Sequence, residues 1–255
     1  MTVRELYAFL NEKIPPSLSC SWDNDGLMCC ADEDAEVHHV LIALDVTDRV
    51  ISEAMERGCD VILSHHPMIF SPLRSVNPRD HIAARVIRLL RGGITVMSFH
   101  TRLDAVEGGV NDVLAQALGL ENVKPFGEGG EEIGRIGTLP CETTPRAFAE
   151  AVKRVTGAEC VQVADAGRPV SRVAVLGGSG SDDVGAAIAA GADTYVSGEL
   201  KHNVLTDAPE RGINLIAAGH HHTENLVCRR LFELVSEADG KISITVIDSN
   251  ETVTV

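Results

Sequence analysis

The sequence predicts an α/β protein, because short apolar runs alternate with amphipathic segments along most of its length. Runs such as 61–63, 94–99 and 213–218 are bounded by glycine, proline or serine, which is typical of buried strands. The segments between them carry helix caps and apolar side chains at helical spacing. Strand and helix in alternation build mainly parallel sheets, so we expect two α/β domains with mixed sheets flanked by helices.

The first half of the chain begins with an amphipathic helix that Pro15-Pro16 ends. Thr47 is placed to cap a second helix, and Gly58 to close it. A proline-rich loop at 67–78 precedes a third helix, which stops at Gly92-Gly93. The elements expected here are helices at 3–13, 47–57, 80–91 and 110–118, and strands at 37–44, 61–63 and 94–99.

A flexible acidic joint is expected at 127–132, where the composition shifts to glycine and glutamate. With a domain boundary at this joint, the sequence predicts a discontinuous metal-binding domain of residues 1–126 plus 211–255, and a smaller inserted domain of residues 127–210. The last strand is expected to return to the first sheet. The elements expected after the joint are strands at 133–139, 159–163, 173–176, 193–196, 213–218 and 241–248, and helices at 145–155, 183–190 and 223–237.

Composition excludes several classes of function. The formal charge of −15 repels a phosphate backbone, so direct nucleic-acid binding is not expected. Seven cysteines, an odd number without a C-x-x-C pair, indicate reduced thiols in a cytoplasmic protein. The first ten residues are not expected to form a signal peptide, and no apolar run approaches the roughly 20 residues that span a bilayer.

Seven of the ten histidines follow short apolar runs, and acidic residues stand near several of them. Open α/β sheets bind ligands outside the carboxyl ends of their strands, so segments far apart in sequence are expected to meet at one place. This pattern predicts a metal site with more than one ion. The segments concerned are Ser64-His65-His66-Pro67, His100 to Asp104, Glu199 to His202, and His220 to Glu224.

His65 and His66 are adjacent after a strand, so their side chains splay apart, which suits one histidine for each of two ions. His100 with Asp104, and His220 with Glu224, have the four-residue spacing that lets two side chains share a helical face. Each pattern alone has a plainer interpretation: a capped loop end, a helix cap, or a carboxylate at the positive end of a helix.

Glu199 and His202 follow an apolar run and are candidates for proton transfer, or else ordinary loop residues. His221 and His222 are expected to point away from the metals. The glycine-rich segment 177–182 matches no nucleotide-binding pattern, so a tight turn is favoured over phosphate contact. In the turn at 22–27, burial is expected to explain Trp22, and Cys29-Cys30 is expected to be structural.

These segments resemble the signatures of the NIF3-like family. The resemblance covers essentially the whole chain, and the order of its motifs is highly specific. Beyond the four histidine segments, it rests on Asp23-Asn24-Asp25-Gly26-Leu27, Ala43-Leu44-Asp45-Val46-Thr47 and Gly109-Val110-Asn111-Asp112.

The resemblance implies a two-domain α/β fold with a dinuclear metal centre, assembled as a toroidal homohexamer. The ligands that it implies are His65, His66, Asp104, His220 and Glu224. Members often carry the label GTP cyclohydrolase 1 type 2 homologue. The chain departs from the family pattern at Arg102, where a small polar residue is common, and at His221-His222, where an aromatic and a small residue are usual.

We therefore expect a metal-dependent hydrolase that acts on a nucleotide or a related small molecule. The mixed ligands suit two divalent ions of Zn, Fe, Mn or Co. Glu199, His202 or His100 would move protons, and Arg102 could pair with a phosphate. The alternative is a metal-binding or regulatory scaffold without chemistry, which an open, water-occupied metal position would argue against. A transcriptional role through a protein partner is a third, weaker alternative.

Overall fold

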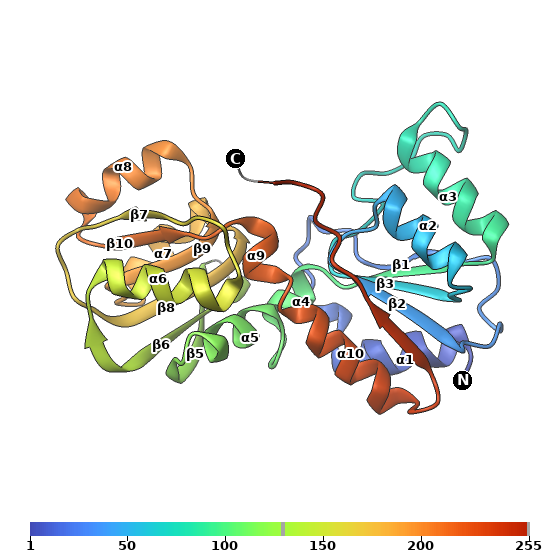
Figure 1. Ribbon diagram of the computed structural model, residues 1–255, viewed down its shortest axis with the longest axis horizontal. Helices are drawn as coiled ribbons and strands as arrows, with labels where there is room; N and C mark the ends of the chain where they lie inside the picture. The colour runs from blue at the N-terminus through green and yellow to red at the C-terminus, as the bar shows by residue number, and fades with distance from the viewer. Residues whose placement is uncertain (129–130, 254–255) are drawn as a thin grey trace. The chain divides into compact units, whose positions relative to one another are not determined.

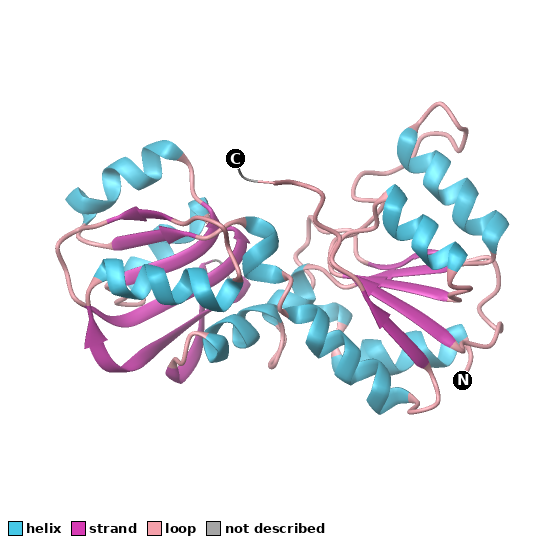
Figure 2. Cartoon of the chain, viewed as in Figure 1, coloured by secondary structure: helices cyan, strands magenta, loops and turns pink. Residues whose placement is uncertain are grey.

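The computed structural model describes residues 1–128 and 131–253, and it confirms the α/β prediction (Figures 1 and 2). The chain divides into two compact units, one of Met1–Val106 with Cys228–Glu251 and one of Glu107–Val227 with Thr252–Val255. The boundaries expected after residues 126 and 210 both fall inside the second unit. One consequence is that His220 and Glu224 belong to the second unit, whereas the sequence assigned them to the first domain.

The first unit has a five-stranded sheet in the order β1-β4-β3-β2-β11, in which all neighbours are parallel except β1 and β4. Helices α1 and α10 cover one face, and α2 and α3 cover the other (Figure 1). The parallel pairing of β11 with β2 confirms that the last strand returns to this sheet. The strands are β1 Gly26–Cys29, β2 His39–Ala43, β3 Val61–Ser64, β4 Thr95–Ser98 and β11 Ser243–Val246.

The helices of the first unit begin where the sequence provides caps. Thr2 and Glu5 form a capping box at the start of α1, and Thr47 and Asp80 accept backbone N–H groups at the starts of α2 and α3. The apolar faces of α2 and α3 pack on the strands with which these helices alternate in sequence. The helices are α1 Val3–Lys13, α2 Asp48–Glu56, α3 His81–Gly92, α4 Thr101–Ala105 and α10 Val227–Ala238, with a short 3-10 turn at Pro16–Leu18.

The second unit has a six-stranded sheet in the order β5-β6-β8-β9-β10-β7. The central strands β8, β9 and β10 are parallel, while β5, β6 and β7 pair antiparallel. One core lies between this sheet and helices α5 and α6, and another lies against α7 and α8. The strands are β5 Glu121–Glu128, β6 Glu131–Thr143, β7 Gln162–Ala164, β8 Val170–Ser179, β9 Thr194–Glu199 and β10 Asn214–Ala217.

The remaining helices are α5 Val110–Ala117, α6 Pro145–Thr156, α7 Val184–Ala189, α8 His202–Arg211 and α9 His220–Glu224, with a 3-10 turn at Ser181–Asp183. Strands β1 and β5 and helix α8 are absent from the sequence prediction. Strand β1 has only four residues, and β5 includes Pro125 and mostly exposed side chains, so neither carries a clear apolar alternation. The single helix expected at 223–237 is instead the pair α9 and α10.

The described residues of the acidic joint expected at 127–132 belong to strands, because β5 pairs antiparallel with β6 up to the Glu128 and Glu131 partners. Gly129 and Gly130, which belong to that joint, lie outside the described residues. Among the described helices, none combines the length and the apolar character that crossing a bilayer requires.

Candidate metal centre

Three histidines lie together at the carboxyl edge of the first sheet. His65 and His66 follow β3, and His100 follows the adjacent parallel strand β4. Their ring centroids are 4.9 to 5.7 Å apart. The ligand atoms that the three residues offer lie within 4.8 Å of one another, so this group could hold a metal ion. Parallel strands end at one edge, which is why neighbours in the sheet bring together residues 34 positions apart in the sequence.

Each of these rings is held through its Nδ1 atom by an oxygen acceptor. An Nδ1–H that donates to a carbonyl or carboxylate leaves Nε2 as the basic nitrogen, which is the form that binds a metal ion. The orientation of all three rings is therefore fixed by groups around them. His65 donates to the backbone oxygen of Phe99 at 2.9 Å, His66 to Oδ1 of Asp45 at 2.7 Å, and His100 to Oδ1 of Asp23 at 2.8 Å.

Asp23 is the most firmly held of these acceptors. Its side chain is fully shielded from solvent, and its Oδ2 accepts from both the backbone N–H and the hydroxyl of Thr101, at 3.0 and 2.6 Å. Burial raises the pKa of the Asp23 carboxyl. The hydrogen bonds from His100 and Thr101 and the charge of His100 outweigh that effect and lower the pKa well below its usual range. Asp23 is therefore a buried, ionised acceptor.

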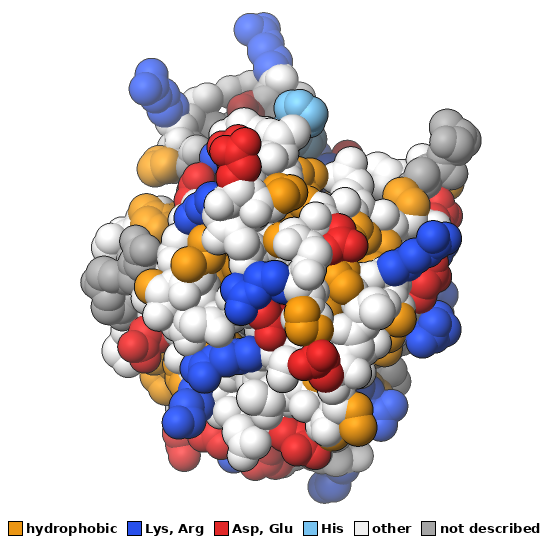
Figure 3. Space-filling view, turned by 90° about the vertical axis from the view of Figure 1, so that its left-hand side faces the viewer, with side chains coloured by type: hydrophobic (Ala, Val, Ile, Leu, Met, Phe, Trp, Pro, Cys, Tyr) orange, Lys and Arg blue, Asp and Glu red, His pale blue; other side chains and the backbone are white. Residues whose placement is uncertain are grey.

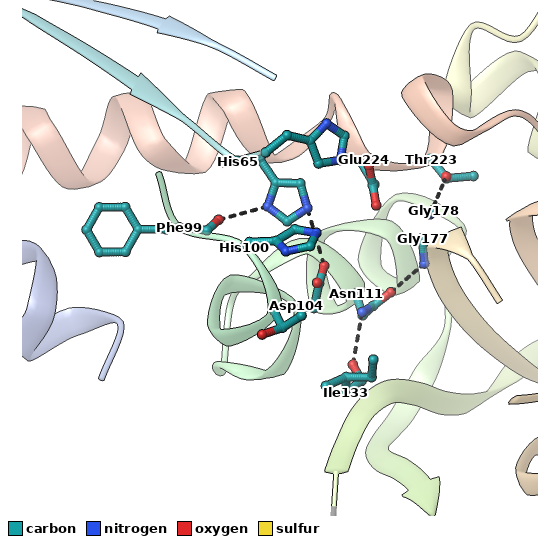
Figure 4. Close-up of polar contacts among 12 residues, drawn as sticks. His65, Phe99, His100, Asp104, Asn111, Ile133, Gly177, Gly178, Thr223 and Glu224 are labelled. Atoms are coloured by element: carbon teal, nitrogen blue, oxygen red, sulfur yellow. Dashed lines mark hydrogen bonds and ion pairs between the residues drawn. The ribbon is translucent and has the colours of Figure 1, made fainter. Parts of the chain in front are cut away.

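Asp104 lies one turn into α4, and its Oδ1 is 3.6 Å from Nε2 of His65 (Figure 4). The side chain of His65 is fully buried, and that of Asp104 is 12% exposed. The predicted spacing from His100 to Asp104 is thus that of a short helix, in which the Asp104 N–H donates to the carbonyl of His100 at 3.2 Å. This carboxylate faces the imidazole from the side opposite to the Phe99 carbonyl.

Arg102 has a structural role, and its expected pairing with a phosphate is wrong. Its side chain is 1% exposed, and Nε donates to Asp25 at 3.0 Å. Nη1 donates to Asn11 at 2.7 Å and to the carbonyl of Ile14 at 3.1 Å, and the guanidinium lies over the Phe99 ring. These contacts all lie inside the protein, so the Arg102 guanidinium is not accessible to a phosphate group of a ligand.

The second unit presents its own group at the carboxyl edge of its parallel strands. Glu199 ends β9, and His220 opens α9 three residues after the end of β10. Nε2 of His220 lies 3.1 Å from Oε2 of Glu224, and Nδ1 lies 3.5 Å from Oε1 of Glu199. The Glu224 side chain is 5% exposed, whereas that of Glu199 is 62% exposed. The expected four-residue spacing of His220 and Glu224 therefore does bring these two side chains together.

The glycine-rich segment forms the wall on which this pair rests. Gly177 and Gly178 are residues of β8 rather than of the expected turn, and Gly178 has a φ of +69°. A Cβ atom at Gly178 would stand 2.2 Å from Oε1 of Glu224 and 3.1 Å from Nε2 of His220. The amides of Gly177 and Gly178 donate to Asn111 and Thr223 (Figure 4). Glycine is needed here because the side chains of His220 and Glu224 approach the backbone closely. Both amides hydrogen-bond to side chains of the protein itself.

The other histidines are placed less centrally. His202 is the first residue of α8 and is exposed. The rings of His221 and His222 are 5.7 Å apart. His222 and Glu199 line a hollow of about 310 Å³, together with Cys160 and Gln162 among others.

Sequence reasoning missed Asp23, Asp45 and Asn111 as residues that position the site. Asp45 stands two residues beyond β2, on the sheet edge that carries the histidines, so the rule that located the histidines was also able to find it. Asp23 precedes an antiparallel strand, and the sequence explained it as part of a turn. The donors that the structure assembles, imidazole nitrogens and carboxylate oxygens, are those that Zn, Fe, Mn and Co bind.

Comparisons with known proteins agree with this architecture. The family model Duf34/NIF3 (NGG1p interacting factor 3) matches residues 1–253. A Clostridium perfringens protein named GTP cyclohydrolase 1 type 2 homolog is 31% identical over 244 residues, which cover 93% of this chain and 92% of that protein. The Schizosaccharomyces pombe protein NIF3 homolog is 34% identical over 236 residues, which cover 85% of this chain and 84% of that protein.

Two solved structures are similar over nearly the whole chain. A hypothetical protein of Staphylococcus aureus superposes with a TM-score of 0.88 at 28% identity, covering 100% of this chain and 99% of that one. Reduced HcgD from Methanocaldococcus jannaschii gives a TM-score of 0.83 at 29% identity, covering 96% and 97%. On the family match, the relatives and the shared fold, this chain belongs to the Duf34/NIF3 family.

Proposed function

We propose that this protein is a hydrolase that uses a dinuclear centre of divalent cations and acts on a nucleotide or a related small molecule. The observation that carries the proposal is the common orientation of His65, His66 and His100, whose Nδ1 atoms all donate to fixed oxygen acceptors. Any buried imidazole N–H needs an acceptor, but three rings held in this way, with ligand atoms within 4.8 Å of one another, form the arrangement typical of metal-binding histidines.

The proposed metal ligands are His65, His66 and Asp104 of the first unit and His220 and Glu224 of the second. Within each unit a buried carboxylate lies close to an imidazole nitrogen, at 3.6 Å for Asp104 and 3.1 Å for Glu224. Two anionic and several neutral donors suit two divalent ions of Zn, Fe, Mn or Co. When bound, such ions acidify water, so that hydroxide is available for hydrolysis near neutral pH.

Proton transfer is assigned to groups near these ligands. Glu199 suits a general base, because its carboxylate is largely exposed while it lies 3.5 Å from Nδ1 of His220. His100 is a second candidate, because its Nδ1 donates to Asp23 and Nε2 is left as the nitrogen that can accept a proton. His202 is a third candidate, since it is exposed three residues after Glu199 at the start of α8.

A small-molecule substrate fits the surface better than a nucleic acid does. On the face in Figure 3, Lys and Arg side chains are interspersed with Asp and Glu among the described residues. That face (Figure 3) therefore offers a phosphate backbone no continuous basic track, and the formal charge of −15 repels such a backbone. The names of the relatives motivate testing GTP first. We also propose a homohexameric assembly, as the family resemblance implies, and a cytoplasmic location, which suits seven cysteines without a disulfide.

The test combines metal analysis with turnover. Protein purified without added metal or affinity tags is expected to carry about two divalent ions per chain, and His65→Ala and Asp104→Asn are expected to lose them. His38→Ala is the matched control, because the His38 side chain is 75% exposed on a surface pair with Glu36. The metal-loaded protein is then assayed with a nucleotide panel. Turnover that disappears in Glu199→Gln, with metal retained, supports the hydrolase.

The alternative, a metal-binding scaffold without chemistry, makes a different prediction. It requires full metal occupancy with no turnover of any nucleotide by the intact protein. It also requires that the metals have no open position, because closed coordination is the mark of structural sites. Absence of metal from the intact protein would contradict both functions.

A further inference from the structure

Two large aromatic side chains are exposed beside the three histidines. Trp22 is 57% exposed and Phe70 is 52% exposed, so the burial that the sequence predicted for Trp22 is wrong. Among the described Phe, Tyr and Trp residues, Phe232 is the one other exposed side chain, at 36%. Leaving a tryptophan in water forgoes hydrophobic stabilisation, and exposed apolar groups that cluster commonly mark a binding site.

Both rings contact His100. The Trp22 and Phe70 centroids each lie 6.3 Å from that of His100, at interplanar angles of 78° and 84°. The two aromatic rings are also 6.3 Å from each other and inclined at 59°. These separations fall within the range of about 4.5–7 Å that aromatic pairs favour. The pair Trp22 and Phe70, named here the aromatic platform, is thus continuous with the histidine group.

The backbone under the platform is fixed. Asp23, next to Trp22, is bound to His100 and Thr101, and Asp25 accepts from the His100 N–H at 3.2 Å. The Asn24 amide donates to the carbonyl of Ile69, which joins the turn of Trp22 to the loop of Phe70. Binding to such a surface requires little ordering of the protein, because both segments are already held in place.

We propose that the aromatic platform stacks against a planar heteroaromatic ring of the ligand, such as a purine base. The inference rests on the proposed function in that the ligand is a small molecule brought to the metal centre. An apolar, uncharged surface suits a neutral ring better than a phosphate group. Since His100 belongs to the histidine group, a ring on the platform lies next to the proposed cations. The platform thereby selects ring-bearing substrates.

Trp22 is the only tryptophan of the chain, so its fluorescence reports on the platform directly. The protein is saturated with Zn²⁺, which has no redox chemistry. It is then titrated with GTP, ATP and guanosine, and with ribose 5-phosphate and inorganic triphosphate as ring-free probes. Ring-bearing probes are expected to quench or shift the emission of Trp22, and ring-free probes to leave it unchanged at concentrations where calorimetry shows binding.

Substitutions extend the test. Trp22→Ala and Phe70→Ala are each expected to weaken ring binding about 5-fold or more by calorimetry, since stacking on an aromatic contributes about 1–3 kcal/mol per base. Trp22→Phe is expected to restore most of the affinity. Phe232→Ala is the matched control and should bind as the unaltered protein does. Because both platform residues are more than half exposed, thermal unfolding should show a retained fold.

Unchanged Trp22 emission with every ring-bearing probe, or alanine variants that bind those probes at full strength, would overturn the inference. So would Trp22 emission that changes only on dilution to single chains, which would make the platform a contact between copies. Ring binding without turnover leaves the platform standing and removes the hydrolase. Turnover of ring-free substrates, with unchanged Trp22 emission for all probes, supports the hydrolase and contradicts the platform.

Discussion

His100 donates its Nδ1–H to Asp23 across 2.8 Å, although 77 residues separate the two in sequence. The carboxylate is buried and also accepts twice from Thr101, so the imidazole cannot turn without breaking a shared set of hydrogen bonds. The neighbouring His66 has the same relationship with Asp45. Two loops that contribute no proposed metal ligand of their own therefore fix the direction of two histidines.

Replacing Asp23 with asparagine tests this relationship. The amide keeps the size of the side chain but removes its charge and presents a donor where an acceptor is needed. Turnover by the metal-loaded protein is expected to fall about 100-fold or more, because Asp23 orients His100, a proposed proton-transfer group. Asp182→Asn is the control, because that side chain is 89% exposed in a surface pair with Lys201. Equal turnover by the two metal-loaded variants would contradict the positioning role of Asp23.

Arg102 is expected to matter for stability and not for phosphate recognition. Arg102→Met leaves the Asp25 carboxylate, whose side chain is 6% exposed, without its guanidinium partner. Breaking a buried ion pair in this way costs about 3–5 kcal/mol of the free energy of unfolding, which urea titration measures. Arg229→Met, at a side chain 81% exposed, should cost little. A variant that unfolds normally but binds phosphorylated ligands more weakly would restore the phosphate role.

The residues that the sequence located are those for which a local rule suffices. His65, His66, His100 and His220 follow apolar runs, and the carboxyl ends of parallel strands meet at one edge, so their grouping within each unit follows from order along the chain. The four-residue spacing in α9 likewise depends only on helix geometry.

The remaining features depend on tertiary contacts that no short window contains. Tryptophan side chains are largely buried in most proteins, so burial is expected for Trp22. It is exposed because the neighbouring Asp23 and Asn24 hold its turn in place by hydrogen bonds to His100 and Ile69. The sequence around Gly178 is typical of a turn. In the structure, glycine is required there because His220 and Glu224, more than 40 residues away in sequence, occupy the space that a side chain would fill. The domain boundaries differ for a similar reason. Helix α5 packs on the second sheet and β5 is a strand of that sheet, although both follow the first unit directly in sequence.

Buried thiols predict how stability depends on alkaline pH. Burial, together with nearby charges, raises the pKa of Cys29 and Cys59 to about 11 and that of Cys228 to about 12. A group whose pKa is higher in the folded protein contributes stability below its ordinary value of 9.0, and this contribution is lost as the pH rises through the raised pKa. Urea midpoints are therefore expected to fall progressively between about pH 9 and pH 12.

The same thiols can be counted chemically. At pH 8 a maleimide is expected to modify the exposed Cys141 and Cys160 rapidly, and the buried thiols only after denaturation. Mass spectrometry of the native protein should show two rapid additions per chain, while Cys30, which is half-buried, is expected to react more slowly. Rapid labelling of Cys228 at this pH would contradict both its burial and its raised pKa, and the alkaline loss of stability would then need another cause.

Gly178 offers the sharpest test of the second ligand pair, because the chain supplies a matched glycine. Gly178 and Gly157 have φ values of +69° and +71°, so alanine at either position carries a similar backbone strain of about 1–2 kcal/mol. A Cβ at Gly157 meets nothing within 4 Å, whereas one at Gly178 meets Oε1 of Glu224 at 2.2 Å. Both variants should lose stability in urea titration. Only Gly178→Ala should also lose metal, by elemental analysis, because the carboxylate must move. Equal metal content in the two variants would show that Glu224 does not need its observed position to bind an ion.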